Sequence, residues 1–358
     1  MAGAVDWAVA ERVAVRFAGT EPFSRSYHYD SLAPDFDELT AQAQTLVERH
    51  TGWSSSAGDA RARVADRSDW IRANIASFQR MLRPLTERLD SKLSGGALAP
   101  IAGRFAGAEM GAVLGWMSTR VLGQYDMLVL EDEDADDQDI VYYVGPNILA
   151  LEKRFGFPPR EFRLWVALHE VTHRTQFTGV PWLRPYFLSL MNDMLGHVDP
   201  DPAQLFRAVG RVADAVRTGH NPLADGGVLT LLASDDQRAT MDRIGGLMSL
   251  LEGHGDVTMD RAGGDRIPSA DRFGSVLRQR RQTLSGPVKL LQRLIGLEAK
   301  LAQYEQGERF IEAVENTSGS AYLGMAFESP EQLPTLAEIR DPDAWMRRVR
   351  PYALAAGS

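Results

Sequence analysis

The chain has 358 residues, of which 44% are hydrophobic and 24% are charged, and its formal net charge is -9. Such a composition is typical of a globular protein and excludes a disordered chain and a fibrous repeat. The excess of acidic residues gives no general attraction to nucleic acid or to an anionic membrane. The lack of cysteine excludes disulfides, iron–sulfur clusters and a thiol nucleophile. A bound metal would therefore need His, Asp or Glu ligands.

The first 17 residues do not form a secretory signal, because Asp6, Glu11 and Arg12 interrupt their apolar positions. We therefore expect a cytoplasmic protein that binds neither nucleic acid nor a membrane. The predicted elements are mostly helices. We expect one large domain over residues 1–358, with a helical N-terminal part (1–125) and a second part (126–358) that holds a β-hairpin and the functional residues.

A long helix is predicted over residues 68–93, where apolar residues recur at spacings of three and four. Ser68 is its expected N-cap and Gly95 its expected stop, and Pro84 is expected to kink or split it. Further along the chain, the same periodicity predicts helices over residues 202–217, 236–252 and 287–316.

The stretch 97–123 has glycine at every fourth position over part of its length, a pattern also found where membrane helices pair. These residues are Gly103, Gly107, Gly111 and Gly115. Arg104, Glu109 and Arg120 interrupt the stretch, and charges inside a membrane span are costly. We therefore expect a buried helix whose glycine face lets another backbone come close.

Two short β-favouring runs, residues 127–130 and 140–144, flank the acidic run EDEDADDQD of residues 131–139. They predict an antiparallel hairpin with a long acidic tip. The acidic run could bind calcium, but it lacks the spacing of an EF-hand loop, and a solvated loop is the more common structure for such a run.

The residues that point to chemistry lie on a helix predicted over residues 159–178, which contains the HExxH motif of residues 169–173. His169 and His173 are four positions apart and project side by side, so that both can bind one Zn²⁺ ion. Glu170 can then reach a metal-bound water, take its proton as general base and pass it to the leaving group. The alternative is a structural one, in which two histidines have hydrogen-bond partners on a buried helix and Glu170 is exposed.

A zinc site of this type needs a third protein ligand. The metzincin pattern is excluded, because Gln176 and Gly179 stand where it requires glycine and histidine. Glu252 follows an apolar helical run, and a buried carboxylate there is costly unless it is metal-bound or paired. We predict Glu252 as the third ligand, with a buried salt bridge as the alternative.

Asp256 lies four positions after Glu252, on the same helix face, and is the predicted acceptor for the ring N–H of a ligand histidine. His254, between them, is predicted to donate to the oxyanion of the reaction; a metal ligand and a surface histidine are its alternatives. His197 is a further candidate ligand, and Tyr304 a further candidate donor.

Three segments resemble a family of uncharacterised bacterial zincin-like hydrolases, one branch of which is associated with the biosynthesis of a deazaflavin coenzyme. They are residues 142–177, which contain the HExxH motif, residues 181–190, and residues 246–260, which contain GLMSLLEGHGDVTMD. The resemblance implies a largely helical zincin-like fold with the HExxH helix at its centre. Together with the predicted hairpin, the expected fold is mainly α with a small antiparallel hairpin or sheet. The resemblance also implies the same roles for His169, Glu170, His173 and Glu252, although Glu252 lies farther along the chain than the third ligand of common glutamate-zincins.

We therefore expect a zinc-dependent hydrolase of metallopeptidase type that acts on a peptide or a small amide. An extended substrate is expected along the edge of the strand at 140–144. A non-catalytic zincin-fold protein that serves in binding or assembly, and a small-molecule amidohydrolase, are the alternatives.

Overall fold

The computed structural model describes residues 4–21, 23, 26–93, 99–126, 139–196, 235–282 and 297–356. The chain forms two compact units. The first comprises residues 1–179 and 258–273, and the second comprises residues 180–257 and 274–358. The expected single domain stays a prediction.

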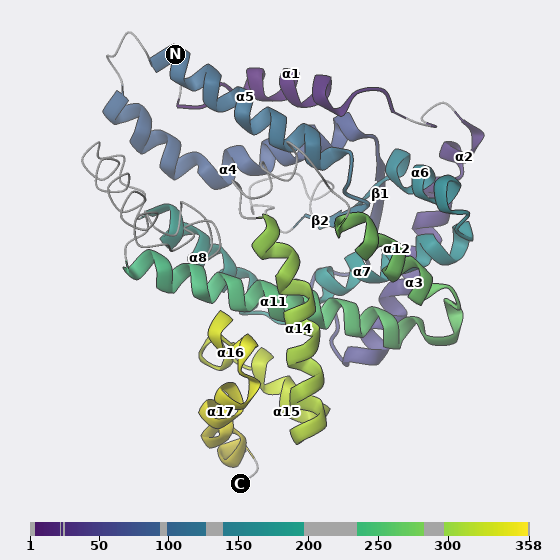
Figure 1. Cartoon of the computed structure of the whole chain (residues 1–358), viewed down its shortest axis with the longest axis vertical. Coiled ribbons are helices and arrows are strands. Elements are labelled where there is room, and N and C mark those ends of the chain that lie inside the picture. The colour runs from purple at the N-terminus through teal and green to yellow at the C-terminus, as the bar shows by residue number, and fades with distance from the viewer. Residues whose placement is uncertain are drawn as a thin grey trace. The chain divides into compact units, whose positions relative to one another are not determined.

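The first unit is built from helices around a small sheet (Figure 1). Its elements are α1 (Trp7–Ala18), α2 (Tyr27–Asp30), α3 (Leu32–Thr51), β1 (Arg61–Ala65), α4 (Arg67–Leu93), α5 (Ala99–Ser118), β2 (Gly123–Tyr125), β3 (Ile140–Val144), α6 (Gly145–Phe155), α7 (Pro159–Gly179), the short η2 (Gly264–Arg266) and the start of α12 (Ala270–Gln282).

Helices α1 and α5 lie side by side (Figure 1) and touch through the predicted glycine stripe. A Cβ atom added to Gly107, Gly111 or Gly115 would lie 2.2, 2.4 or 2.6 Å from a carbonyl oxygen of α1 or of its N-cap residue. The two backbones are therefore too close for any side chain at these positions, which confirms the expected buried glycine face.

The predicted helix at 68–93 is observed as α4, and Pro84 lies inside it without splitting it. Its cap differs from the prediction. The side chain of Asp66 accepts a 2.7 Å hydrogen bond from the backbone N–H of Asp69, so Asp66 has the capping role and Ser68 lies within the first turn.

The described strands form one sheet in the order β1-β3-β2. Strand β3 pairs in parallel with β1, where Arg61 faces Ile140, and antiparallel with β2, where Gly123 faces Tyr143. All five residues of β3 are buried. Tyr143 stacks on Phe36 of α3, with ring centroids 3.9 Å apart, so α3 covers one face of the strand.

The β-hairpin was therefore only partly predicted. The antiparallel partner of β3 is β2, at residues 123–125, and residues 127–138 lie outside the described part of the chain. The expectation that residues 140–144 form the substrate edge is wrong, because β3 is paired on both sides. Among the described strands, β1 and β2 form the edges of the sheet.

The second unit is helical in its described residues. Its elements are α8 (Leu183–Gly196), α11 (Asp235–Gly263) as far as Val257, α14 (Leu297–Ser318), α15 (Ser320–Gly324), the short η3 (Met325–Phe327) and η4 (Pro330–Gln332), α16 (Leu336–Arg340) and α17 (Pro342–Ala356). Helix α11 contains the helix predicted at 236–252. Helix α14 contains the described part of the one predicted at 287–316, and residues 202–217 lie outside the described residues.

Helices α11 and α14 cross at two glycines. A Cβ atom on Gly307 would lie 1.9 Å from the carbonyl oxygen of Ser249, and one on Gly253 would lie 2.3 Å from the carbonyl carbon of Gly307. This contact fixes the helix that carries Glu252 and His254 against α14. None of the helices in the described part of the chain is both long enough and apolar enough to cross a membrane.

Candidate metal centre

The HExxH motif lies in the second half of α7, as predicted. Pro159 begins this helix, a position where its missing N–H costs nothing. The helix is buried along most of its length, and its first half is fixed by Arg163, whose guanidinium donates to Glu152 of α6 at 2.8 and 3.0 Å and also contacts Asp35 of α3. The amino-terminal half of α7, ahead of the motif, is therefore tied to α6 and α3.

The two histidines of the motif converge on one point. Nε2 of His169 and Nε2 of His173 are 3.2 Å apart, and the two rings are nearly perpendicular, at 89°. With Zn–N bonds of about 2.05 Å and a tetrahedral angle, two ligand nitrogens lie about 3.3 Å apart. The observed separation therefore suits two ligands of one tetrahedral zinc ion.

The ring of His173 is oriented by Gln176, one turn farther along α7. Nδ1 of His173 lies 3.0 Å from Oε1 of Gln176. Because an amide oxygen only accepts hydrogen bonds, Nδ1 carries the proton in this pair and the lone pair of Nε2 is left for a metal. The helical period places Gln176 on the same face as His169 and His173, but its contact with the His173 ring was not predicted; the i+3 spacing from His173 is the signal of this contact.

Glu170 is buried and lies against strand β2 of the first unit. A Cβ atom on Gly123 would be 2.5 Å from its Cγ and 2.7 Å from its Oε1, so the carboxylate fits only because residue 123 is glycine. Burial raises the pKa of Tyr143, whose hydroxyl bonds Thr40 at 2.7 Å, and the charge of Glu170 raises it further. Tyr143 is therefore neutral beside the carboxylate.

Glu252 belongs to the same group of donors. His169, His173 and Glu252 are a group of side chains that could hold a metal ion, and Glu252 is buried on α11. Two imidazoles and one carboxylate form the donor set of catalytic zinc sites that keep a fourth position for water. The residues present therefore fit zinc.

The other predicted site residues lie on α11 or outside the described part of the chain. His254 is half-buried on α11, with its ring centroid 5.1 Å from that of Phe327, and Asp256 is half-buried one turn after Glu252. Their predicted roles, as oxyanion donor and as histidine partner, stay predictions. His197 and the side chain of Tyr304 lie outside the described part of the chain.

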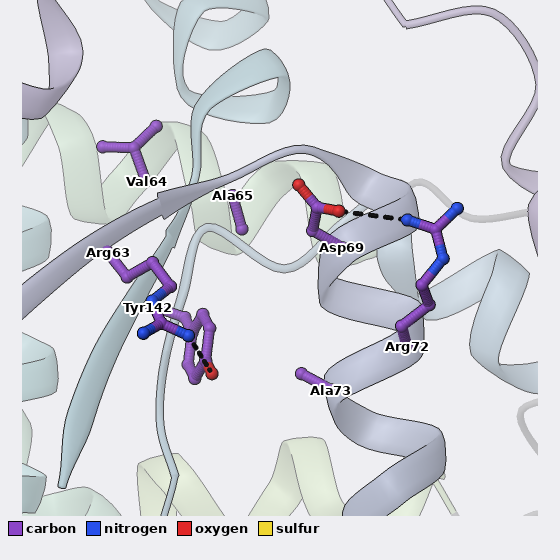
Figure 2. A pocket seen from close by; sticks show the side chains of 7 residues that line it. All are labelled: Arg63, Val64, Ala65, Asp69, Arg72, Ala73 and Tyr142. Atoms are coloured by element: carbon purple, nitrogen blue, oxygen red, sulfur yellow. Dashed lines mark hydrogen bonds and ion pairs between the residues drawn. The ribbon is translucent and has the colours of Figure 1, made fainter. Parts of the chain in front are cut away.

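A pocket of about 330 Å³ in the first unit lies at β1 and α4 and includes neither histidine of the motif. Figure 2 shows the Arg63 guanidinium near the Tyr142 ring and the ion pair between Asp69 and Arg72. Arg72 also pairs with Glu11, at 3.1 Å. The charges of this pocket are thus largely balanced, and its residues offer no set of metal donors.

Comparison with known proteins gave two matches. The family model of zincin-like metallopeptidases matches residues 5–346. The crystal structure of a "putative hydrolase with a novel fold" from Chloroflexus aurantiacus is similar to this chain, with a TM-score of 0.71 and 29% sequence identity. The match covers 97% of this chain and 99% of that one. No curated protein matches the sequence.

Proposed function

Because this chain belongs to the family of zincin-like metallopeptidases, we propose that it is a zinc-dependent hydrolase that cleaves amide bonds in extended peptides. The observation that carries this proposal is the convergence of two imidazole nitrogens, 3.2 Å apart, on the helix that also carries the buried carboxylate of Glu170. A structural zinc site has no need of that carboxylate, whereas a hydrolytic site needs a general base next to the metal.

In this proposal His169, His173 and Glu252 hold the ion. Zinc, when bound, lowers the pKa of a coordinated water and polarises the substrate carbonyl. Glu170 accepts the proton of the attacking water and returns it to the amine that leaves. Gln176 keeps the proton of His173 on Nδ1, and His254 is the proposed donor to the developing oxyanion.

Strand β2 is the proposed docking edge for the substrate. The N–H of Val144 donates to Leu122, and the N–H of Asp126 donates to Ile140. In an antiparallel pair such bonded positions alternate, so the backbone groups of Gly123 and Tyr125 point to the outer edge. An extended peptide that adds to this edge places its backbone beside Glu170, which lies against Gly123.

The first test is the metal content of protein purified without added metal. The parent is expected to hold about one zinc per chain and His169→Ala none, while His50→Ala, at an exposed position on α3, retains it. Added zinc is expected to raise the melting temperature of the parent and not that of His169→Ala, because a bound ligand stabilises only the state that binds it.

The second test is hydrolysis of a library of fluorescence-quenched peptides. The parent is expected to cleave members of the library, and Glu170→Gln is expected to keep its zinc and lose at least 10²-fold in rate. Zinc binding without cleavage of any peptide or small amide would instead indicate the binding or assembly protein, and cleavage of small amides alone would indicate the amidohydrolase. A parent that takes up no zinc would refute the whole proposal.

A further inference from the structure

Arg174, which follows the ligand His173 directly, is a fully buried arginine. Its Nε lies 3.1 and 3.0 Å from the two carboxylate oxygens of Asp139, and its Nη2 lies 2.5 Å from one of them. Nη2 also donates to the carbonyl oxygen of Gly58, at 2.8 Å. A single guanidinium thus joins the motif helix to two other segments of the first unit.

Both acceptors stand just ahead of a strand. Asp139 precedes β3 directly, and Gly58 lies three residues before β1. Both have left-handed backbone, with φ of 56° and 81°, a conformation that is uncommon for a residue other than glycine. Because Arg61 and Ile140 are register partners, Arg174 bridges the amino-terminal ends of the two parallel strands.

The face of α7 that carries Arg174 also carries the proposed general base. Glu170 lies four positions earlier, one helical turn away. On this face Glu170 lies against Gly123, at the start of β2, and Phe177 lies near Tyr125, at its end, with ring centroids 6.4 Å apart. The face therefore runs along β2, and Arg174 is its ionic contact with the sheet.

Stability alone is a poor explanation for this arginine. Its Nη1 atom is buried and has no hydrogen-bond partner in the described part of the structure. Well-packed apolar residues of similar volume are often at least as stable as a buried ion pair. A bidentate guanidinium, however, fixes direction and distance, which apolar contacts do not.

We propose that Arg174, through Asp139 and Gly58, is a positioning residue that holds the Glu170 face of the motif helix in register with strand β2. This inference rests on the proposed function, because it assigns the register a role in catalysis. In this inference Asp139 and Gly58, at the two strand ends, help to orient the Glu170 side chain towards a substrate on β2.

The test compares Arg174→Met with Arg163→Met in the full-length protein. Arg163 is the matched control: it is nearly fully buried on the same helix and is also ion-paired, but with Glu152 and Asp35 rather than with the sheet. Both variants are expected to melt at a lower temperature than the parent and to keep about one zinc per chain. A catalytic group that is misplaced by about 1 Å loses on the order of 10²-fold in rate. The kcat is therefore expected to fall about 10²-fold for Arg174→Met, which displaces Glu170, and less than threefold for Arg163→Met.

A double variant, Arg174→Met with Asp139→Leu, covers the case in which Arg174→Met folds poorly. Because both charges are removed, its melting temperature is expected to return towards that of the parent. Its kcat is expected to stay low, whereas KM changes little. Recovery of both melting temperature and kcat would overturn the inference, because a merely stabilising role predicts that the two return together.

Amide hydrogen exchange over residues 122–126 and 140–144 provides a readout that needs no substrate. These amides are expected to exchange at least tenfold faster in Arg174→Met than in Arg163→Met. Unchanged exchange in Arg174→Met would overturn the inference even if the parent hydrolyses peptides. A parent without hydrolytic activity, but with this change in exchange, would instead overturn the proposed function and leave the contact to the strand ends supported.

Discussion

The contact between Gly123 and Glu170 leads to a prediction that separates catalysis from metal binding. A Cβ atom on residue 123 would lie 2.5 Å from Cγ of Glu170, whereas ordinary contacts of this kind begin at about 3.4 Å. In Gly123→Ala, therefore, the Glu170 side chain or the strand must move by about 0.9 Å. Cγ is close to the backbone, so a rotation of the carboxylate alone does not relieve the clash.

A displacement of this size is expected to lower kcat/KM about 10²-fold, or about 2.7 kcal/mol in transition-state stabilisation. The three atoms nearest to the added methyl group all belong to Glu170, so zinc content is expected to stay at about one per chain. The assay is kcat/KM on a cleaved peptide together with zinc content. The control is Gly196→Ala, where an added Cβ has no neighbour within 4 Å.

A double variant tests the cause. Once Glu170→Gln has removed the base, the position of that side chain no longer matters, so Gly123→Ala is expected to add almost nothing in the Glu170→Gln background. Two results would refute the reasoning: full activity in Gly123→Ala, or additive losses in the double variant.

Three further predictions concern metal affinity and stability. Gln176→Leu removes the acceptor of the His173 ring N–H and is expected to weaken zinc binding about 10- to 100-fold in competition with a fluorescent chelator; an unchanged Kd would contradict this role. Gly111→Ala places a Cβ atom 2.4 Å from a carbonyl oxygen of the facing helix α1. It is expected to lower the free energy of unfolding, measured in urea, by about 1–3 kcal/mol. An unchanged unfolding midpoint would argue against that contact. Burial opposes ionisation of Glu338, yet its hydrogen bonds, chiefly from Arg348, hold the pKa of its carboxyl below the ordinary value. Glu338→Gln is therefore expected to lower the melting temperature at pH 7, and its difference from the parent is expected to shrink as the pH falls below 4.5. A difference that does not depend on pH would exclude this cause.

The parts of the site that depend on local spacing could be predicted from the sequence. The helix over 159–178 and the pairing of His169 with His173 follow from a period of 3.6 residues, and the structure has both. The mainly helical zincin-like fold was also predicted, and the family match confirms it. The association with a deazaflavin-coenzyme branch stays a prediction.

The parts that depend on distant pairing could not be predicted. Strand β1 is short and begins with Arg61 and Arg63, and no local pattern indicates that it pairs with residues near 140. Because β1 was missed, β3 was assigned to an edge. The role of Gly123 was missed for the same reason: only the fold places the strand at 123–125 against the helix at 159–179.

The burial of β3 has a consequence for the handling of this protein. Its sequence, Ile-Val-Tyr-Tyr-Val, is a run of strongly β-forming apolar residues, which in an unpaired state is prone to self-association into fibrils. In the native sheet β1 and β2 cover both of its edges, and β1 comes from a segment about eighty residues earlier. Fragments that begin after β1 are therefore expected to aggregate. The acidic run immediately before β3 places like charges beside this segment and so opposes its stacking during synthesis and refolding.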